Sequence, residues 1–362
     1  MKFKKYLEKI YIAIINFNKS VFLACISIFL FFVISIFSYQ FMPDKTPMAN
    51  SIELAISKKK PGFKAKFLLF KIQKKHLKKT FFFGTENPYN EVLIQDYNIQ
   101  DSIVSYSIPN NPEKKKVHIS KIYFDSSGMC VKEKKYLLGT DKYGRDLLSR
   151  IILGTRVSFS VGFISVFISI IIGVFLGMLS GYYGGRIDVF ICWLINVVWS
   201  IPTLLLVIAI SLVLGKGFWQ VFVAVGLTMW VEVARVTRGE VLRISRLPYI
   251  EAVKLFGVND MKIMFNHILP NVLNPLIIIS AANFATSVLL ESGLSFLGIG
   301  VQPPLPSWGM IIKNHYGFIV MEKAYLSFFP GLCIVLLVLS FMVLGNGLRD
   351  ILDQKSKYHK TS

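Results

Sequence analysis

Long apolar segments alternate with short polar connections along most of the chain. A bilayer core of about 30 Å is crossed by roughly 20 apolar residues in a helix. Six segments reach or approach this length: residues 21–42, 157–179, 189–214, 217–234, 276–300 and 324–345. Pro202 lies inside the third segment, which we expect to be one helix despite it. The pattern predicts an all-α polytopic membrane protein with six transmembrane helices.

The first apolar segment could instead be a cleaved signal peptide. The apolar region of a signal peptide is about 7–15 residues long, and residues 21–42 exceed it. No small-x-small cleavage site follows in residues 39–43. We therefore expect a retained transmembrane helix.

A different pattern fills residues 43–136, between the first two apolar segments. Apolar and polar residues alternate in stretches such as 117–124, which is typical of β-strands. Lysine runs occur at 58–60, 74–79 and 114–116. We expect an extramembrane insert that forms a small β-rich domain. Its lysines form a solvated face, or else contact the external leaflet or an acidic partner.

The charge of the short loops predicts an orientation. The loops on one side are residues 1–20, 180–188, 235–272 and 346–362. They carry 16 of the 41 Lys and Arg residues, whereas the short loops on the other side carry three. Because Lys and Arg are enriched in cytoplasmic loops, we expect both termini to be cytoplasmic, including the tail 349–362, and the insert to lie outside.

Residues 43–156 conflict with this orientation, because they carry 22 Lys and Arg residues and would lie outside. The charge rule discounts loops longer than about 60 residues, so the six-helix topology stands. The alternative is a five-helix chain with this segment inside, which would place the 235–272 loop outside.

Composition excludes several classes of protein. The chain is 53% hydrophobic and 17% charged, against about 45–50% and 25% in soluble domains. With 14% aromatic residues it is not a disordered chain. The four Cys and five His show no metal-ligand spacing, and no hydrolase or phosphate-loop motif occurs. We expect no catalytic site, no metal site and, since no basic–aromatic motif accompanies the net charge of +20, no nucleic-acid binding.

Residues 235–272 are too polar to span the membrane and too patterned for a plain linker. A short helix begins near Glu251 and ends at Gly257, which can adopt positive φ. Asn259 or Asp260 can cap a second short helix over 261–268, which we expect to end at Pro270. A helix–turn–helix of this kind suits docking into a groove on a partner.

This stretch resembles the EAA loop of ABC-transporter permeases, in which EAAxxxG is followed after nine residues by IxLP. The matching residues are Glu251, Ala252, Gly257, Leu269 and Pro270. Val253 replaces the second Ala, and His267 stands where the general pattern has Ile, as is familiar in the peptide-permease branch. The resemblance implies that the loop, residues 239–272, couples the chain to cytoplasmic ATPases.

Four further motifs narrow the family, and together they cover residues 137–354. Residues 138–150 resemble LGTDxxGRDxLSR, 181–188 resemble GYxGGxxD, and 295–309 resemble SFLGxG…QPP…WG. Residues 345–354 resemble GDGLRDxLDP, with Asn346 for the first Asp and Gln354 for Pro. The match is to the C-type subunit of oligopeptide/dipeptide permeases. The insert has no counterpart in this pattern.

The resemblance implies the type I ABC importer permease fold over residues 137–348, in a bacterial cytoplasmic membrane. It implies a heterodimer with a homologous permease subunit, two ATP-binding subunits and an external substrate-binding protein. ATP is hydrolysed by the partner subunits, and this chain, surrounded by membrane lipid, binds no cofactor and performs no bond chemistry. The implied substrate is a peptide, although importers of nickel and of other small solutes share much of the pattern.

Small residues and charges in the apolar segments have structural explanations. Gly173, Gly177 and Gly181 recur every four residues, so they lie on one helix face and let another helix approach closely. Glu232 lies three residues before Arg235, and we expect the two side chains to pair.

The fifth apolar segment and the loop after it hold candidate pathway residues. An acid such as Glu291 inside a membrane is costly and by default functional, so it lines a cavity, or else it pairs with another subunit or caps a broken helix. Pro303 and Pro304 stiffen the next loop, which the resemblance places beside the external gate. Trp308 belongs to that gate or anchors the chain at the membrane interface.

Arg145 and Asp146 precede the second apolar segment. Apolar residues after them suggest a helix lying at the membrane interface, with Leu147, Leu148, Ile151 and Ile152 on its apolar side. The two charges anchor this helix, or else have a gate or surface role.

Two other classes of protein remain open. A secondary transporter would need paired intramembrane acids or internal symmetry. A membrane-anchored binding or scaffold protein would have its working part in residues 43–136.

Overall fold

The computed structural model describes residues 19–72, 79–80, 82–109, 111–124, 128–215 and 217–358. Some residues used in the sequence analysis lie outside the described residues. They are the lysines of residues 1–18, most of the 74–79 lysine run, Lys216 and the last four residues. The chain forms two compact units, which we call the helical unit (Met1–Phe32, Ser158–Gln302 and Leu332–Ser362) and the insert unit (Val33–Val157 and Pro303–Gly331).

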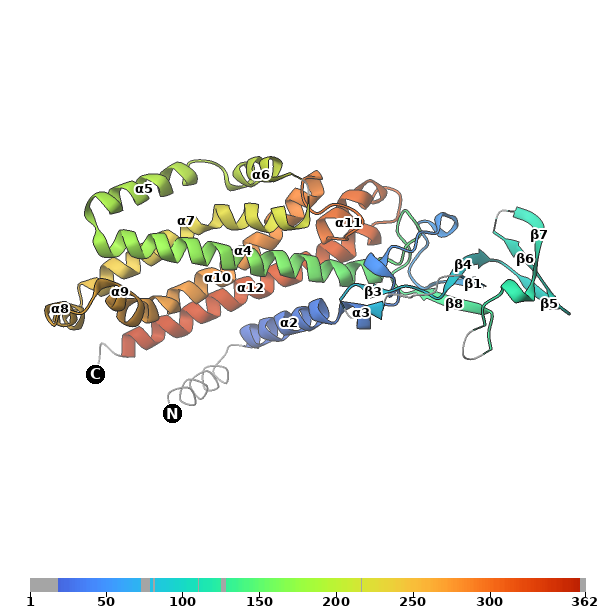
Figure 1. Ribbon diagram of the computed structural model, residues 1–362, viewed down its shortest axis with the longest axis horizontal. Helices are drawn as coiled ribbons and strands as arrows, with labels where there is room; N and C mark the ends of the chain where they lie inside the picture. Colours follow the sequence, from blue (N-terminus) through green and yellow to red (C-terminus); the bar gives the residue numbers. More distant parts are fainter. Residues whose placement is uncertain are drawn as a thin grey trace. The chain divides into compact units, whose positions relative to one another are not determined.

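The helical unit holds the long apolar helices (Figure 1). Its described elements are α2 (Lys19–Ile36), α4 (Leu147–Tyr183), α5 (Gly185–Trp199), α6 (Thr203–Leu214), α7 (Phe218–Ser245), α8 (Pro248–Leu255), α9 (Asp260–Ile263), η4 (Met264–Ile268), α10 (Leu269–Leu297) and α12 (Tyr325–Tyr358). Among the described residues, five helical runs are long and apolar enough to cross a membrane, and the α5–α6 pair is a sixth candidate. The predicted polytopic all-α fold is confirmed.

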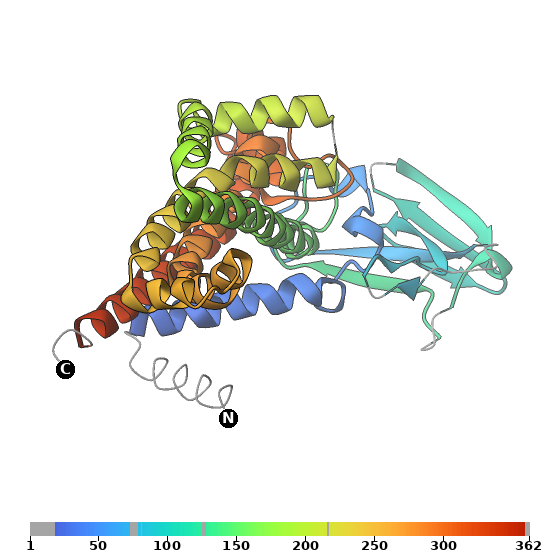
Figure 2. The same ribbon diagram turned by 60° about the vertical axis from the view of Figure 1, so that its left-hand side comes forward.

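The third predicted helix is not continuous. Residues 189–214 fall into α5 and α6, which meet at 92° across residues 200–202 (Figure 2, green and yellow-green). Pro202 has no N–H to donate and disfavours helical geometry at Ile201 before it. The expectation of one straight helix through Pro202 was therefore wrong.

Helices α4 and α7 approach closely along a row of glycines. Gly173, Gly177 and Gly181 all face α7, and a Cβ on Gly177 would lie 2.6 Å from the Ala234 carbonyl oxygen. Real Cβ atoms do not approach that closely, so larger residues here would push the two helices apart. Because glycine has no side chain, these positions permit tight van der Waals packing between helices in a membrane.

The insert unit is rich in β-strands, as predicted. Its strands are β1 (Phe63–Lys71), β2 (Lys79–Thr80), β3 (Gly84–Thr85), β4 (Tyr89–Ile94), β5 (Tyr97–Gln100), β6 (Ile103–Ile108), β7 (Asn111–His118) and β8 (Val131–Tyr136). They form antiparallel sheets in the orders β4-β1-β8, β2-β3 and β5-β6-β7. The strand predicted over residues 117–124 is present only at its start. Strand β7 ends at His118, and a short 3₁₀ turn follows.

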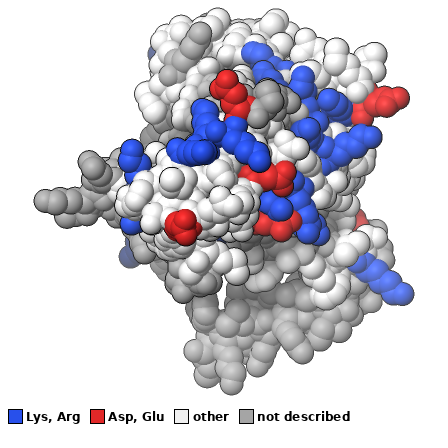
Figure 3. Space-filling view, turned by 90° about the vertical axis from the view of Figure 1, so that its right-hand side faces the viewer, with Lys and Arg blue, Asp and Glu red and all other residues white. Residues whose placement is uncertain are grey.

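The central strand β1 explains the two small cores of the insert. Its side chains alternate between faces, as in any strand: Phe67 packs with Leu93 and Tyr136 on one face, and Leu68 packs with Val104 on the other. Many exposed residues of the unit are lysines, and Figure 3 shows Lys and Arg side chains gathering on its surface with Asp and Glu among them.

The insert unit also includes residues outside the predicted insert. It takes in the start of α4, helices α3 (Ser38–Phe41) and α11 (Trp308–His315), and four 3₁₀ turns. Long-range hydrogen bonds join these parts: the Thr140 amide donates to the Lys59 carbonyl at 3.1 Å, and the Tyr325 hydroxyl donates to the same oxygen at 2.8 Å. The domain boundaries at 43 and 136 stay a prediction.

Candidate functional site

The loop between α7 and α10 forms two short helices joined by a sharp turn. Helix α8 begins with Pro248 at its first position and is followed by Gly257 at φ +72°. The Asn259 side chain then caps α9 by accepting a hydrogen bond from the Met261 amide at 2.9 Å. The turn thus uses one glycine for positive φ and one Asn for capping, as predicted.

The expected end of the second helix at Pro270 was wrong. A π-helical turn, η4, follows α9, and α10 begins at Leu269, so helical structure runs through Pro270 and Pro275. Pro270 directly follows the π-helical turn, where the α-helical hydrogen-bond pattern is already interrupted, so its missing N–H removes no bond from a regular α-helical ladder. The loop therefore continues into a transmembrane helix without a break.

One face of the loop is fixed by apolar packing. Ile250 of α8, Ile263 of α9 and Ile268 of η4 are fully buried in a cluster with Ile244 at the end of α7. Burying a side chain of this size stabilises a fold by about 1.5–3 kcal/mol. The loop is consequently a packed part of the helical unit (Figure 1).

The opposite face is open and apolar. Leu255 and Phe256 are 89% and 86% exposed, beside Gly257. The predicted coupling residues divide between surface and interior: Glu251, Ala252, Gly257 and Pro270 are exposed, and His267 and Leu269 are half-buried. Two large apolar side chains held out by a fixed helix are typical of a docking surface.

Polar contacts tie the loop to the end of α4. The Tyr182 hydroxyl donates to Asp260 Oδ1 at 2.6 Å, and Lys254 Nζ lies 4.7 Å from the centre of the Tyr182 ring. Tyr182 belongs to the GYxGGxxD segment, so the structure brings that motif and the EAA-like loop together.

The rest of that segment holds α5 against α7. Asp188 accepts two hydrogen bonds from Arg238, at 2.6 and 2.7 Å, and a third from the Ser180 hydroxyl. A bidentate Arg–carboxylate pair fixes orientation as well as distance. Arg235, in contrast, lies 3.3 Å from the centre of the Trp199 ring, and no ion pair with Glu232 is found among the described residues, contrary to our expectation.

Glu291 is fully buried within the helical unit. It accepts hydrogen bonds from the Ser158 hydroxyl at 3.2 Å and from the Ser295 hydroxyl at 2.7 Å. Ser295 in turn accepts from the Val301 amide at 3.1 Å, so the carboxylate organises the C-terminal end of α10. Helix α10 continues through Gly293 to Leu297, so Glu291 does not cap a broken helix there. A role in the pathway stays a prediction.

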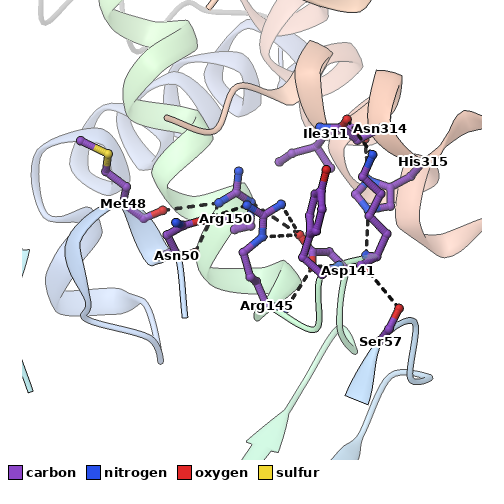
Figure 4. Close-up of polar contacts among 12 residues, drawn as sticks. Met48, Asn50, Ser57, Asp141, Arg145, Arg150, Ile311, Asn314 and His315 are labelled. Carbon is purple, nitrogen blue, oxygen red and sulfur yellow. Dashed lines mark hydrogen bonds and ion pairs between the residues drawn. The ribbon is translucent and has the colours of Figure 1, made fainter. Parts of the chain in front are cut away.

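The LGTDxxGRDxLSR segment forms a buried polar network in the insert unit (Figure 4). Asp141 Oδ2 accepts from Arg145 Nε at 2.7 Å, and its Oδ1 accepts from the amides of Tyr143 and Arg145 at 2.8 and 2.9 Å. The second guanidinium, of Arg150, lies 3.9 Å from Asp141 Oδ2. One carboxylate thus faces two buried arginines.

These arginines hold a distant segment of the chain. Arg145 Nη1 donates to Asn50 Oδ1 at 2.9 Å, and Arg150 Nη1 donates to the Ala49 carbonyl at 3.3 Å. The predicted interface-lying helix was wrong, because Arg145 and Asp146 are buried and α4 runs directly from Leu147 into the membrane segment.

His315 of α11 joins the same network and was missed by the sequence analysis. Its Nε2 accepts from the Lys142 amide at 3.2 Å, which leaves Nδ1–H to donate to the Ile311 carbonyl at 2.7 Å. Burial lowers the pKa of His315, so both contacts are kept by the neutral ring. A single His far from the others in the sequence carries no pattern that could have revealed this.

Trp308 is fully buried rather than placed at a membrane interface. Its indole Nε1–H donates to the Ile151 carbonyl at 3.0 Å, and it lies against Gly154. Pro303 and Pro304, in contrast, are exposed. An interface anchor was therefore the wrong interpretation of Trp308, and a gating role for this loop stays a prediction.

Known proteins resemble this chain over most of its membrane part. The family model described as "Binding-protein-dependent transport system inner membrane component" matches residues 173–358. A glutathione transport system permease protein, GsiD, of Pectobacterium atrosepticum is 40% identical over 220 residues, which is 61% of this chain and 73% of the relative.

Two further known proteins are similar to parts of this chain. A dipeptide transport system permease protein, DppC, of Haemophilus influenzae is 41% identical over 223 residues, covering 61% of this chain and 75% of the relative. A solved structure of the MetNI methionine ABC transporter aligns with TM-score 0.46 and 18% identity over 57% of this chain and 97% of that chain. The chain belongs to the family of binding-protein-dependent transport system inner membrane components, as an ABC-transporter permease of the oligopeptide/dipeptide type.

Proposed function

We propose that this chain is the permease subunit of an ABC importer that carries short peptides across a bacterial cytoplasmic membrane. The observation that carries the proposal is the α8–α9 loop, which is packed on one face and presents Leu255 and Phe256 on the other. The peptide substrate is supported by the relatives, whose names specify dipeptide and glutathione transport.

The proposal includes partners that supply the chemistry. Two cytoplasmic ATPases hydrolyse ATP, one docking on this loop and one on a homologous permease subunit that completes the pathway. An external binding protein delivers the peptide. Residues 251, 252, 257, 267, 269 and 270 are the proposed coupling residues, and Glu291, Pro303 and Pro304 stay candidates for the pathway or gate.

The mechanism transmits a rigid displacement. Helical structure is continuous from Asp260 to Leu297, and Tyr182 ties the loop to α4. Closure of the ATPases therefore moves the loop together with α4 and α10 and shifts the helices from an inward-facing to an outward-facing state. ATP drives this shift because the ATPases contact the two states differently.

The test is peptide uptake by the complete complex in vesicles. We expect labelled trialanine to accumulate only with ATP and the binding protein, and a proton or sodium gradient alone to support no uptake. Uptake driven by an ion gradient without ATP would establish a secondary transporter instead. Uptake of nickel but no peptide would keep the importer and reassign its substrate.

The orientation has its own test, in a chain whose native cysteines are replaced by serine. We expect Lys115→Cys on β7 to react with a membrane-impermeant maleimide in intact cells. Lys262→Cys on α9 should react only after the membrane is permeabilised. Both residues are exposed, so accessibility in the fold does not differ between them. The reverse labelling pattern would overturn the proposed topology.

A further inference from the structure

A polar cavity of about 500 Å³ lies inside the insert unit. Its lining includes Asp44, Lys45, Glu91, Lys135, Tyr136 and Asp146. A second cavity of about 400 Å³ shares its walls at Ser51, Asn87, Glu91, Lys134 and Tyr136. Sites for small molecules have volumes of roughly 300–1,000 Å³, so the space suits a ligand.

Asp146, which lines this cavity, has one carboxylate oxygen without a hydrogen-bond partner among the described residues. The residue is only 5% exposed, and its Oδ2 caps α4 by accepting from the Ser149 amide at 2.8 Å and from the Ser149 hydroxyl. Its Oδ1 is buried and has no hydrogen-bond partner within the described part of the chain. Leaving a buried acceptor unsatisfied is costly, so this oxygen calls for a donor that the chain does not supply.

Glu91 on β4 presents a second such oxygen. Lys134 on β8 donates to its Oε2, whereas its buried Oε1 lacks a partner among the residues described. Glu91 and Asp146 lie far apart in the sequence, so the geometry of a single turn does not explain why both line the cavity. Burial raises the pKa of the Asp146 carboxyl, and a positively charged donor beside it would favour the ionised form. The two carboxyl groups together suit such a donor.

Several carboxylates lie near the phenol of Tyr136 in the cavity wall. Burial raises the pKa of Tyr136, and the carboxylates of Glu91, Asp146 and Asp44 raise it further by opposing ionisation of the phenol. A metal ion is not the favoured occupant, because no group of three or more His, Cys, Asp or Glu residues with ligand geometry occurs among the described residues. An organic ammonium group fits the two acceptors better.

The lining as a whole is balanced in charge. Its carboxylates are Asp44, Glu91, Glu133 and Asp146, and its lysines are Lys45, Lys132, Lys134 and Lys135. Lys45 and Lys135 are exposed at the rim, whereas Asp146 is buried. A ligand that carries one ammonium and one carboxylate matches this arrangement, with its ammonium inside and its carboxylate toward the rim.

We propose that this cavity binds a small zwitterion, an amino acid or short peptide, through its primary ammonium group. The ammonium pairs with the carboxylates of Asp146 and Glu91, and the carboxylate of the ligand pairs with Lys45 or Lys135. The insert would then be a peptide-binding site separate from the transport pathway. The inference rests on the proposed function for the choice of peptide as ligand class.

The test is isothermal titration of the purified full-length chain in detergent with trialanine. We expect trialanine to bind saturably. N-acetyl-trialanine should bind about tenfold or more weakly than trialanine, since acetylation removes the charged donor. Putrescine, which has ammonium groups but no carboxylate, should also bind at least tenfold more weakly. Equal binding of N-acetyl-trialanine or of putrescine would overturn the assignment. A separate titration with free alanine tests whether an amino acid is sufficient. If alanine binds and trialanine does not, the ligand is an amino acid and not a peptide.

Two variants locate the binding site. Asp146→Asn removes the charge but keeps an oxygen that can cap α4. Glu91→Gln removes the charge on β4 and keeps a side chain of the same size. Each should weaken trialanine binding about tenfold or more. Asp96→Asn, an exposed residue of the same unit outside both cavities, should bind like the parent chain. If Asp146→Asn does not fold, Glu91→Gln decides alone, and parent-like binding by the folded variants would place trialanine elsewhere and sink the proposal.

Transport by the whole complex separates this inference from the proposed function. Trialanine binding that depends on Asp146 or Glu91, without any ATP-driven peptide uptake, would refute the proposed function and leave the binding site intact. Normal uptake with no such binding would refute the binding site alone.

Discussion

Gly257→Asp is expected to abolish stable association with the ATPase subunit and to reduce ATP-driven uptake to background, while the chain still folds and inserts. Gly257 adopts φ +72°, and a Cβ there would meet nothing within 4 Å. The left-handed conformation costs about 1–2 kcal/mol for a residue with a side chain, and Asp is among those that tolerate it. The loop should therefore keep its conformation.

The damage comes from the new charge on the docking face. The carboxylate would stand beside Leu255 and Phe256, which we propose are covered by the ATPase. A charge buried there without a partner costs several kcal/mol, enough to prevent association. Co-purification of the ATPase with the tagged permease measures the first effect, and vesicle uptake measures the second.

Gly62→Asp provides a matched control. Gly62 lies in the insert unit at φ +84°, and a Cβ there also meets open space. The substitution imposes the same backbone strain and the same charge far along the chain from the loop, so ATPase association should be unchanged. Equal loss in both variants would point to general misfolding, and normal association in Gly257→Asp would refute the coupling role of the loop.

Local sequence chemistry was enough to predict the loop. Gly257 and Asn259 act through their own backbone and the next few residues, so a single sequence contains the information. The error at Pro270 arose because proline normally ends a helix in its interior. Here a π-helical turn precedes it and interrupts the α-helical hydrogen-bond pattern, and such a turn leaves no sequence pattern.

Contacts between distant segments could not be predicted in this way. Apolar periodicity indicated a membrane helix beginning near 157, yet the structure starts α4 at Leu147 because Asp146 caps it and Arg150 reaches the Ala49 carbonyl. Residues 101 positions apart have no pattern that links them in one sequence. His315 and Asn50 were missed for this reason, although the motif containing Asp141 had been recognised.

Asp141→Ala is expected to destabilise the insert unit strongly, by about 3–5 kcal/mol. The substitution leaves the guanidinium groups of Arg145 and Arg150 buried without their carboxylate. It also removes the acceptor for the amides of Tyr143 and Arg145, which shape the turn before α4. Protease resistance of the insert, followed with temperature in the full-length chain, should be lost at a temperature lower by on the order of 10 °C.

Glu133→Ala is the matched control, because it breaks an ion pair in the same unit at the surface. Glu133 lies 3.2 Å from Lys64, and these side chains are 50% and 61% exposed. An exposed pair contributes about 0–1 kcal/mol, since water already solvates both charges, so the protease-resistance midpoint should barely move. Similar small shifts in the two variants would show that the Asp141 carboxylate is not what holds the two arginines in the interior.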